Sequence, residues 1–375
     1  MKILIFSWRD IKHPEAGGSE LYFHEIAKRW AKKGHRIEWI VGGWKGCLRE
    51  EDIDSMHLNR VGNEFSLYLL APFTYLALKE KPDIVLDVSN GIPFFTPLFS
   101  RKKKFIHMHH SHREVWFKEV YPRGGRYKII ALICWFLENK LAPLVYRNVP
   151  AITISQSSAD EIRKDKLIFK KPAIINPGIN FLKYKKLPKN KKPVILFLNR
   201  VKKYKGLDVL LKAVALIQSK DKNMFETWVA GDGDFLAEMK KYANEKHLAK
   251  VTFFGRVSEE KKKKLMQKAW IFINPSFKEG WGIVNIESNY YGTAVLGSDV
   301  GGIKDSVVNG KTGLLFGYGN DKQLAEKIEY LLNHKKELET MSKYGKIYAK
   351  KFAWDEKADD YLNVLLHLEK AFKEE

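Results

Sequence analysis

The sequence predicts an α/β protein with two doubly wound domains. Short runs of β-branched and aromatic residues alternate with amphipathic helical segments, which is the pattern of βαβ units on a parallel sheet. The pattern starts again after a basic, proline-punctuated stretch at residues 185–192, which is typical of a linker. We therefore expect a first Rossmann-like domain over residues 1–185 and a second over residues 186–352.

The expected elements follow in chain order. A strand at 2–7 leads through a glycine-containing loop to a helix over 19–33, and Gly34 occupies the position of a helix C-cap glycine. Ligands of such sheets bind outside the carboxyl ends of the strands, so two facing crevices would form one interdomain site. Further strands are expected at 36–41, 84–88, 104–109 and 151–155 in the first domain, and at 194–199, 226–230, 251–254, 271–274 and 294–297 in the second.

The chain is strongly basic. Its 375 residues include 66 Lys and Arg against 44 Asp and Glu, for a formal charge of +22. Such a surplus indicates a polyanionic partner: nucleic acid, an anionic membrane face or a phosphorylated substrate. Solubility is the plain alternative, and charge alone does not choose among these.

The apolar segments and the cysteines indicate in which cellular compartment the protein is expected. The longest apolar stretches, residues 67–78 and 129–137, are shorter than the roughly 20 residues that cross a bilayer. The first residues lack the apolar core and cleavage site of a signal peptide. Cys47 and Cys134 form no metal-binding pattern, which fits free thiols in a reducing compartment. We expect a cytoplasmic protein that is peripheral on the cytoplasmic face of the membrane.

The strongest motif is PSFKEGWGIVNIES at residues 275–288. It follows a predicted strand, and seven residues separate Glu279 from Glu287. Glu279 can accept hydrogen bonds from sugar hydroxyls, and Glu287, a turn or so into the next helix, can accept a pair from a ribose. An ordinary strand-to-helix turn is the plain alternative for a glycine loop taken alone.

Between the two carboxylates lies a backbone that suits an anionic or hydroxyl-rich ligand. Gly280 and Gly282, on either side of Trp281, let the main chain approach a ligand closely. A helix is expected to begin near Ile283 and Val284, where unpaired N–H groups and the positive end of the helix dipole favour oxygen ligands.

The E-x7-E arrangement within EGWGIVNIE resembles that of retaining glycosyltransferases of family 4, which have the GT-B architecture, and the resemblance extends over nearly the whole chain. It implies transfer of a hexose from a nucleotide-diphosphate sugar, GDP-mannose or a UDP-hexose, with retention at the anomeric centre. It also implies a C-terminal helix over residues 353–375 that crosses back onto the first domain. No cofactor and no essential metal are expected.

The resemblance also assigns donor contacts. Arg200 and Lys205, directly after the first strand of the second domain, would lie on the donor diphosphate. Two fixed cations stabilise the charge of a nucleoside diphosphate leaving group without a metal. Gly231, in the AGDGD run, would lie near the nucleotide. In the first domain, Gly17 and Gly18 resemble the family's loop that contacts the donor phosphate or the acceptor, and Ser19 is a candidate helix cap.

Histidines end a strand of the first domain. The family has a histidine there, close to the anomeric carbon and the donor sugar; His109 is the first candidate and His110 the second. A metal cluster of His107, His109 and His110 is the weaker alternative, because alternation along a strand separates His109 from His110 and no nearby carboxylate completes a set. His107 and His112 are expected to be packed or solvated. The DxD-like run at residues 52–54 is expected in a solvated charged loop.

Basic and apolar residues together suggest where the acceptor comes from. Residues 94–104 (FFTPLFSRKKK), 67–78 and 118–141 combine apolar or aromatic side chains with flanking cations, which suits an anionic bilayer interface. A lipid-linked or glycan acceptor, as in glycolipid or polysaccharide assembly, would follow. The alternative is that FFTPLF is a core helix.

Other functions fit the sequence less well. A nucleotide-sugar epimerase on the same architecture usually lacks this E-x7-E loop paired with R-x4-K, and a phosphorylase would need a longer chain with a lysine-bound cofactor. The charge prompts a non-catalytic nucleic-acid-binding protein, but no helix-turn-helix, zinc-finger or RNP-type pattern is present. No GxGxxG follows the first strand with a suitably placed acid, which disfavours a Rossmann oxidoreductase. Nucleic acid is therefore not an expected partner.

Overall fold

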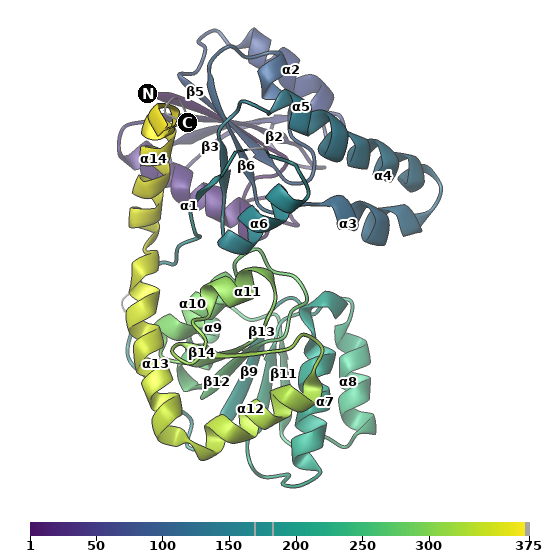
Figure 1. Ribbon diagram of the computed structural model, residues 1–375, viewed down its shortest axis with the longest axis vertical. Helices are drawn as coiled ribbons and strands as arrows, with labels where there is room; N and C mark the ends of the chain where they lie inside the picture. The colour runs from purple at the N-terminus through teal and green to yellow at the C-terminus, as the bar shows by residue number, and fades with distance from the viewer. Residues whose placement is uncertain (169, 182–183, 372–375) are drawn as a thin grey trace. The chain divides into compact units, whose positions relative to one another are not determined.

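The computed structural model describes residues 1–168, 170–181 and 184–371. The chain forms two compact units, each a parallel sheet with helices packed on it (Figure 1). The first unit comprises Met1–Gly178 with Trp354–Glu375, and the second comprises Ile179–Ala353.

The first unit ends earlier than the sequence pattern suggested. The Ile179 N–H donates to the Phe352 carbonyl at 2.7 Å, and Ile179 forms a bridge with Ala353. Lys189, in the expected linker, donates through Nζ to the Ala269 carbonyl at 2.6 Å. The second unit therefore begins at Ile179, and Lys189 is bonded to it rather than lying in a free linker.

The described part of the first unit contains an eight-stranded sheet in the order β3-β4-β2-β1-β5-β6-β7-β8, parallel except between β3 and β4. The order reverses at β1 and β5, which creates a switch point where their carboxyl ends lie side by side. The strands are β1 (Lys2–Ser7), β2 (Arg36–Gly42), β3 (Glu50–Ile53), β4 (Met56–Val61), β5 (Ile84–Ser89), β6 (Lys103–Met108), β7 (Ala151–Thr153) and β8 (Ala173–Ile174). The helices are α1 (Gly18–Lys32), α2 (Leu67–Ala77), α3 (Arg113–Val115), α4 (Arg126–Phe136), α5 (Ala142–Val145), α6 (Gln156–Lys164) and α14 (Trp354–Ala371).

The expectation of a loop at residues 52–54 is wrong, because residues 52 and 53 belong to β3, although the side chains of Asp52 and Asp54 are exposed as expected. Strands β3 and β4 form an antiparallel hairpin there, with Asp54 and Ser55 at positive φ in the turn. Asp52 bonds to His57 at 2.9 Å and Asp54 bonds to His24 at 2.8 Å. The strand escaped prediction because Glu50–Ile53 is acidic and lacks hydrophobic alternation.

The C-terminal helix α14 returns to the first unit and packs on α1. The indole N–H of Trp30 donates to the Ala358 carbonyl at 2.8 Å, and Arg29 Nε pairs with Asp355 at 2.5 Å. Tyr361 is fully buried, and its hydroxyl lies 3.0 Å from Nδ1 of His107 on β6. The helix therefore completes the core of the first unit.

The second unit contains, among its described residues, a six-stranded parallel sheet in the order β11-β10-β9-β12-β13-β14. Its switch point lies between β9 and β12. The strands are β9 (Val194–Leu198), β10 (Glu226–Ala230), β11 (Val251–Gly255), β12 (Ile271–Asn274), β13 (Ala294–Ser298) and β14 (Gly313–Phe316). The helices are α7 (Leu207–Gln218), α8 (Leu236–Glu245), α9 (Glu259–Lys268), α10 (Ile283–Tyr290), α11 (Gly301–Ser306), α12 (Asp321–Asn333) and α13 (Lys335–Ala349).

Alternation along β9 feeds two cores, one on each face of this sheet. Ile195 and Phe197 join one hydrophobic cluster, and Val194 and Leu196 join the other. A strand that is buried on both faces has no polar side, so it appears in the sequence as the continuous apolar run VILFL. The two cores fix the strands whose ends carry the site.

Replacing Tyr361 tests the packing of α14. Tyr361→Ala should lower the free energy of unfolding by about 3–5 kcal/mol, because a fully buried aromatic ring is lost. Tyr361→Phe should cost only about 1–3 kcal/mol, the consequence of leaving His107 without its partner. Denaturant unfolding of the full chain measures both. Equal losses in the two variants would show that the ring does not support the helix.

Candidate active site

Three neighbouring residues after β9 contact the loop after β12, at the switch point of the second unit. A Cβ on Gly206 would lie 2.2 Å from the carbonyl oxygen of Pro275. The Phe277 N–H donates to the Tyr204 carbonyl at 2.7 Å. One residue further along, the Lys205 ammonium forms an ion pair with Glu279. The switch point thus brings together a predicted phosphate-binding lysine and a predicted sugar-binding glutamate.

Glu279 has one engaged oxygen and one available oxygen. Its Oε1 accepts from Lys205, whose side chain is buried, and also lies 3.4 Å from the Asn199 amide and 3.5 Å from the Ser276 hydroxyl. Among the residues that the structure describes, no hydrogen bond reaches Oε2. The Glu279 side chain is 19% exposed, so this second oxygen can meet a ligand.

Arg200 complements this pair. Its side chain is exposed, and it forms no ion pair within the described ranges. The backbone N–H of Arg200 already donates to Oδ1 of Asn199 at 2.9 Å, so only the guanidinium group is available to a ligand. The carboxyl end of β9 therefore presents one cation that is already neutralised, Lys205, and one that is available, Arg200.

Glu287 lies on α10 and pairs with a lysine of its own. Nζ of Lys262, on α9, is 2.7 Å from Glu287 Oε1. Burial raises the pKa of Glu287, and the Lys262 ammonium opposes that rise. No hydrogen bond from the described residues reaches Glu287 Oε2, so the two carboxylates of the motif share one arrangement: a lysine on one oxygen and a free second oxygen.

Glycines let the surrounding loops touch through their backbones. Gly231 has a φ of +140°, and a Cβ there would lie 1.8 Å from the Asn199 carbonyl oxygen. A Cβ on Gly302 would lie 2.1 Å from the carbonyl oxygen of Gly280. Gly282 caps α10 with a φ of +80°. The loops after β9, β10, β12 and β13 are therefore in direct contact, which only glycine allows.

A buried amide network that the sequence analysis missed supports the motif from below. Asn274, at the end of β12, donates to Asn285 Oδ1 at 2.9 Å, and Asn285 donates to the Ser306 hydroxyl at 2.9 Å. The Ser276 hydroxyl donates to Asn274 Oδ1 at 2.8 Å. Polar residues that end an apolar strand and recur in the next helix were the available signal. Their bonds hold the start of α10 in place.

The Trp281 side chain is packed inside the second unit. Its indole is buried and its ring centroid lies 5.4 Å from that of Phe352, so the side chain belongs to the core. Ile283 and Val284 are half-buried and form the first turn of α10. Of these predicted donor contacts, the main-chain N–H groups of the turn are what the fold offers.

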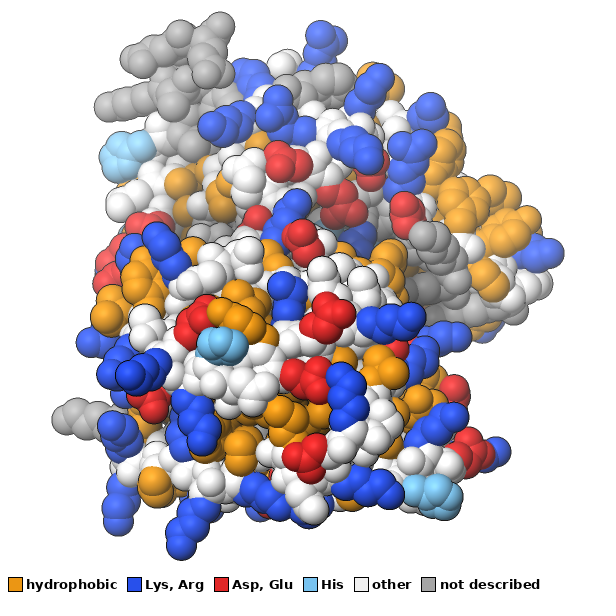
Figure 2. Space-filling model, turned by 60° about the horizontal axis from the view of Figure 1, so that its bottom comes forward, with side chains coloured by type: hydrophobic (Ala, Val, Ile, Leu, Met, Phe, Trp, Pro, Cys, Tyr) orange, Lys and Arg blue, Asp and Glu red, His pale blue; other side chains and the backbone are white. Residues whose placement is uncertain are grey.

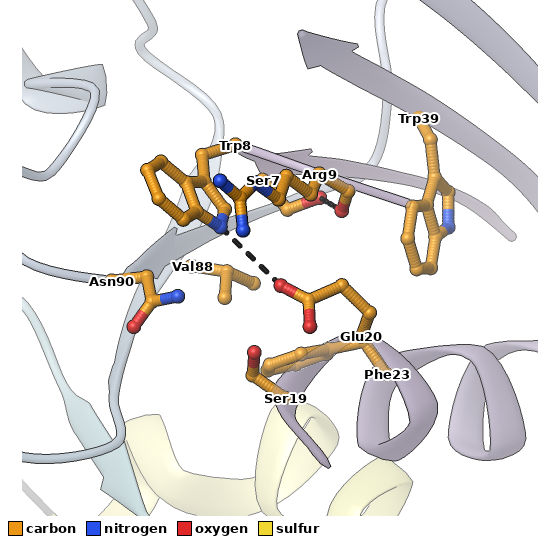
Figure 3. Close-up of a pocket in the computed structure, with 9 residues that line it drawn as sticks. All are labelled: Ser7, Trp8, Arg9, Ser19, Glu20, Phe23, Trp39, Val88 and Asn90. Atoms are coloured by element: carbon orange, nitrogen blue, oxygen red, sulfur yellow. Dashed lines mark hydrogen bonds between the residues drawn. The ribbon is translucent and has the colours of Figure 1, made fainter. Parts of the chain in front are cut away.

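The first unit has a pocket at its own switch point, lined by the ends of β1 and β5 and the residues after them, by α1 and by Trp39 of β2 (Figure 3). Glu20, from the first turn of α1, points toward the Trp8 indole and accepts its N–H at 3.3 Å. The other Glu20 oxygen accepts from the Gly17 N–H at 2.7 Å. The expectation that Ser19 caps this helix is wrong: Gly17 occupies the N-cap position, Gly18 begins the helix, and the Glu20 carboxylate holds the cap.

His109 directly follows β6 and is buried among aromatic rings. Its ring centroid lies 5.9 Å from Tyr22, 5.6 Å from Phe23 and 4.7 Å from His107. Burial lowers the pKa of His109 to about 3, so the ring is neutral near pH 7. His110 instead stacks on His112 at 4.4 Å. Phe23, which contacts the His109 ring, also lines the pocket.

Gly231→Ala tests the close packing of the loops. A methyl group there would collide with backbone, so we expect a loss of stability beyond the ~1–2 kcal/mol of left-handed strain alone. Gly292→Ala is the matched control: its φ is +77° but nothing lies within 4 Å of the added methyl. Thermal unfolding compares the two variants. A loss at Gly231 no larger than at Gly292 would contradict the packing.

Two family models cover most of the chain. The model described as Glycosyltransferase Family 4 matches residues 16–181, and the model described as Glycosyl transferases group 1 matches residues 179–348. Glycosyltransferase MJ1607 of Methanocaldococcus jannaschii is 26% identical over 97% of each chain. Glycosyltransferase MJ1178 of the same organism is 30% identical, over 43% of this chain and 44% of that protein.

Other curated relatives are matched over 39–50% of their own length. One, 31% identical over 48% of this chain and 50% of its own, is the Campylobacter jejuni GalNAc-alpha-(1->4)-GalNAc-alpha-(1->3)-diNAcBac-PP-undecaprenol alpha-1,4-N-acetyl-D-galactosaminyltransferase.

Among solved structures, the sucrose-phosphate synthase of Thermosynechococcus elongatus covers 99% of both chains with a TM-score of 0.77 at 18% identity. Anabaena HepE in complex with UDP-glucose has a TM-score of 0.71 at 17% identity, over 97% of this chain and 99% of that one. These likenesses show the fold, and the family models show the kinship. The chain is a family 4, group 1 glycosyltransferase with the GT-B fold.

Proposed function

We propose that this enzyme is a retaining hexosyltransferase whose donor is a UDP-hexose or GDP-mannose. The observation that carries the proposal is the ion pair between Lys205 and Glu279 at the β9–β12 switch point, with Arg200 exposed just after β9 and Glu287 one helix turn into α10. Cations suit a diphosphate, and carboxylate oxygens suit hydroxyl groups. HepE, which shares the fold, was solved with UDP-glucose, in line with a donor of this class.

The chemistry follows from the charges. As the glycosidic bond breaks, negative charge develops on the diphosphate, and Arg200 and Lys205 would stabilise it in place of a metal. Glu279 already holds Lys205 through one oxygen, so its second oxygen is the one proposed to orient the donor sugar. We propose substitution on the same face of the sugar through an ion-pair-like transition state, with the diphosphate taking the acceptor's proton.

His109 is the histidine proposed for the donor sugar. Its pKa of about 3 means that it would act as a neutral hydrogen-bonding group. Its Nε2 is buried and has no partner among the residues described. The first unit, with the pocket beside Gly17 and Gly18, is the proposed acceptor side.

A donor panel tests this function. UDP-glucose, UDP-galactose, UDP-N-acetylglucosamine and GDP-mannose would be incubated with the protein and EDTA, and thermal shift and nucleotide release recorded. One donor should stabilise the wild type and be hydrolysed slowly without metal. Glu279→Ala and Lys205→Ala should reduce turnover by about 10²–10³-fold, the usual range for a lost charge-stabilising group.

Lys203→Ala is the matched control, because Lys203 precedes Lys205 by two residues and its side chain is exposed. It should behave as the wild type. If no donor binds or turns over, or if the control loses as much as Lys205→Ala, the proposal is wrong.

Two helices of the first unit expose apolar faces that suit a membrane-proximal acceptor. On α2, Leu69, Phe73 and Leu76 recur at helical spacing and are 59–73% exposed. On α4, the apolar side chains at helical spacing are 49–63% exposed: Ile129, Leu132, Ile133 and Phe136. Figure 2 shows hydrophobic side chains gathered over this segment at the right-hand edge. None of the described helices combines the length and apolar character required to cross a bilayer.

The aromatic part of residues 94–104, which was expected on this surface, lies in the core of the first unit. The Phe94 and Phe99 rings pack 5.4 Å and 5.9 Å from Phe6 in the core, so the aromatic part of FFTPLF is internal. Only Leu98 of that run is strongly exposed among its apolar side chains. A 3₁₀ turn at Thr96–Leu98 reverses the chain and turns the aromatics inward.

We propose that α2 and α4 contact an anionic lipid surface and that the acceptor is lipid-linked. Exposed Arg126, Lys128 and Lys140 flank the apolar face of α4, which combines insertion with charge attraction. The Campylobacter relative is named for an undecaprenol-linked acceptor, in line with this class.

Vesicle flotation tests the surface. The wild type should bind vesicles that contain roughly 30–40% phosphatidylglycerol, which imitate an anionic membrane leaflet. Binding should weaken as the salt concentration rises, because salt screens the attraction between the lysines and the lipid. Phe73→Asp and Ile133→Asp should each weaken binding about tenfold, because a buried aromatic or aliphatic side chain contributes ~1.5–3 kcal/mol. Ile347→Asp, at an exposed apolar position of the second unit, is the control. Equal losses in all three variants, or no flotation of wild type, would contradict the proposal.

A further inference from the structure

Helix α9 carries four consecutive lysines, and one of them turns inward. Lys262 is 17% exposed, whereas Lys264, two residues later, is 56% exposed. Nζ of Lys262 lies 2.7 Å from Glu287 Oε1 and 3.4 Å from Glu259 Oε2. The same face of α9 continues one turn later with the buried side chains of Leu265 and Met266. Lys262 is therefore part of the packed face of the helix.

The partial burial of the Lys262 ammonium group carries an energetic cost that its neighbours must offset. Removing an ammonium group from water is unfavourable unless a counter-charge and hydrogen bonds replace the water. Glu287 supplies both, and Lys262 does the same for Glu287. The ionisable groups that face Glu287 are Lys262 and Glu259 from α9 and Tyr291 from the end of α10. Lys262 is the one cation among them.

We propose that Lys262 is a positioning residue for the nucleotide: it fixes one oxygen of Glu287 and keeps this carboxylate ionised, so that Glu287 accepts hydrogen bonds from the two ribose hydroxyls. The inference rests on the proposed role of Glu287 toward the donor ribose. An ionised carboxylate offers only acceptors, which two hydroxyl donors require, whereas a protonated one also presents a donor. Lys262 would thereby favour ribonucleotides over 2′-deoxyribonucleotides.

The proposal has a definite pH signature. Burial raises the pKa of Glu287 and Lys262 restrains it. Without the lysine charge, the pKa of Glu287 rises further, so a smaller fraction of the carboxylate is ionised at the lower pH than in the wild type. Binding that needs the ionised form should therefore weaken toward pH 6 in the variant more steeply than in the wild type.

The experiment is calorimetric titration of the full chain with UDP, GDP and their 2′-deoxy forms at pH 6 and pH 8. Lys262→Gln should raise the Kd of the ribonucleotide about tenfold at pH 8, because Glu287 loses the ion pair that fixes one of its oxygens, and more at pH 6, where less of the carboxylate is ionised. It should also reduce the preference over the deoxy form. Lys262→Arg should restore most of the affinity. Lys264→Gln, on the exposed side of the same helix, should match the wild type.

Glu287→Gln keeps the shape of the site without the charge and serves as the second background. If Lys262 acts through Glu287, adding Lys262→Gln to Glu287→Gln should cause no further loss, even where the single lysine variant is less stable. A further loss of similar size would overturn the inference. So would a Lys262→Gln single variant that binds as the wild type does at both pH values. Failure of the wild type to bind either nucleotide would instead overturn the proposed function and this inference with it.

Discussion

Backbone-to-backbone contact at the β9–β12 switch point is the constraint on which the second unit's site depends. Gly206 meets Pro275 and Gly231 meets Asn199 at distances that leave no room for a side chain. Because these loops touch, Lys205 reaches Glu279 although 74 residues separate them in the chain. A wider spacing would separate the cation from the carboxylate. The charges of the site are thus a consequence of how closely its loops can approach.

In the first unit, aromatic packing rather than backbone contact holds the proposed site residue in place. Its switch point between β1 and β5 opens a pocket, but aromatic packing holds the surroundings: Tyr22 and Phe23 of α1 enclose His109, and Tyr361 of α14 reaches His107. Desolvation by these rings, more than any charge, determines the protonation of His109. The C-terminal helix therefore contributes to the environment of a proposed site residue as well as to stability.

Most of the fold was predictable because local patterns of apolar residues indicate its strands and helices. Buried parallel strands are continuous apolar runs, so the strands at 226–230 and 271–274 were predicted with the bounds that the structure shows. The acidic strand β3 lacks that pattern and was missed. Glu20 as the cap of α1 was also missed, since Ser19 has the stronger intrinsic preference, and the bonds of Glu20 to Trp8 and to the Gly17 N–H became visible only in the structure.

The predicted site residues divide in the same way. Glu279 and Glu287 were predicted from their motif, and Arg200 and Lys205 from the family resemblance; the fold brings Lys205 and Glu279 together, and the roles of all four stay predictions. Trp281 was placed with them by adjacency, but a neighbour in sequence can point into the core. Lys262 was hidden in a run of identical lysines. Its position one helical turn before Leu265 and Met266 was the signal that it faces inward.

The pairing of Lys205 with Glu279 bears on which anions this site attracts. A small ion such as inorganic phosphate meets a lysine that already has a counter-ion, and binding would place its charge beside a carboxylate. Arg200 alone offers such an ion little beyond a solvated surface pair. A ligand that carries both phosphate oxygens and hydroxyl donors can satisfy the lysine and the carboxylate together. The pair would thus let the enzyme ignore abundant phosphate in its surroundings while remaining open to a sugar nucleotide.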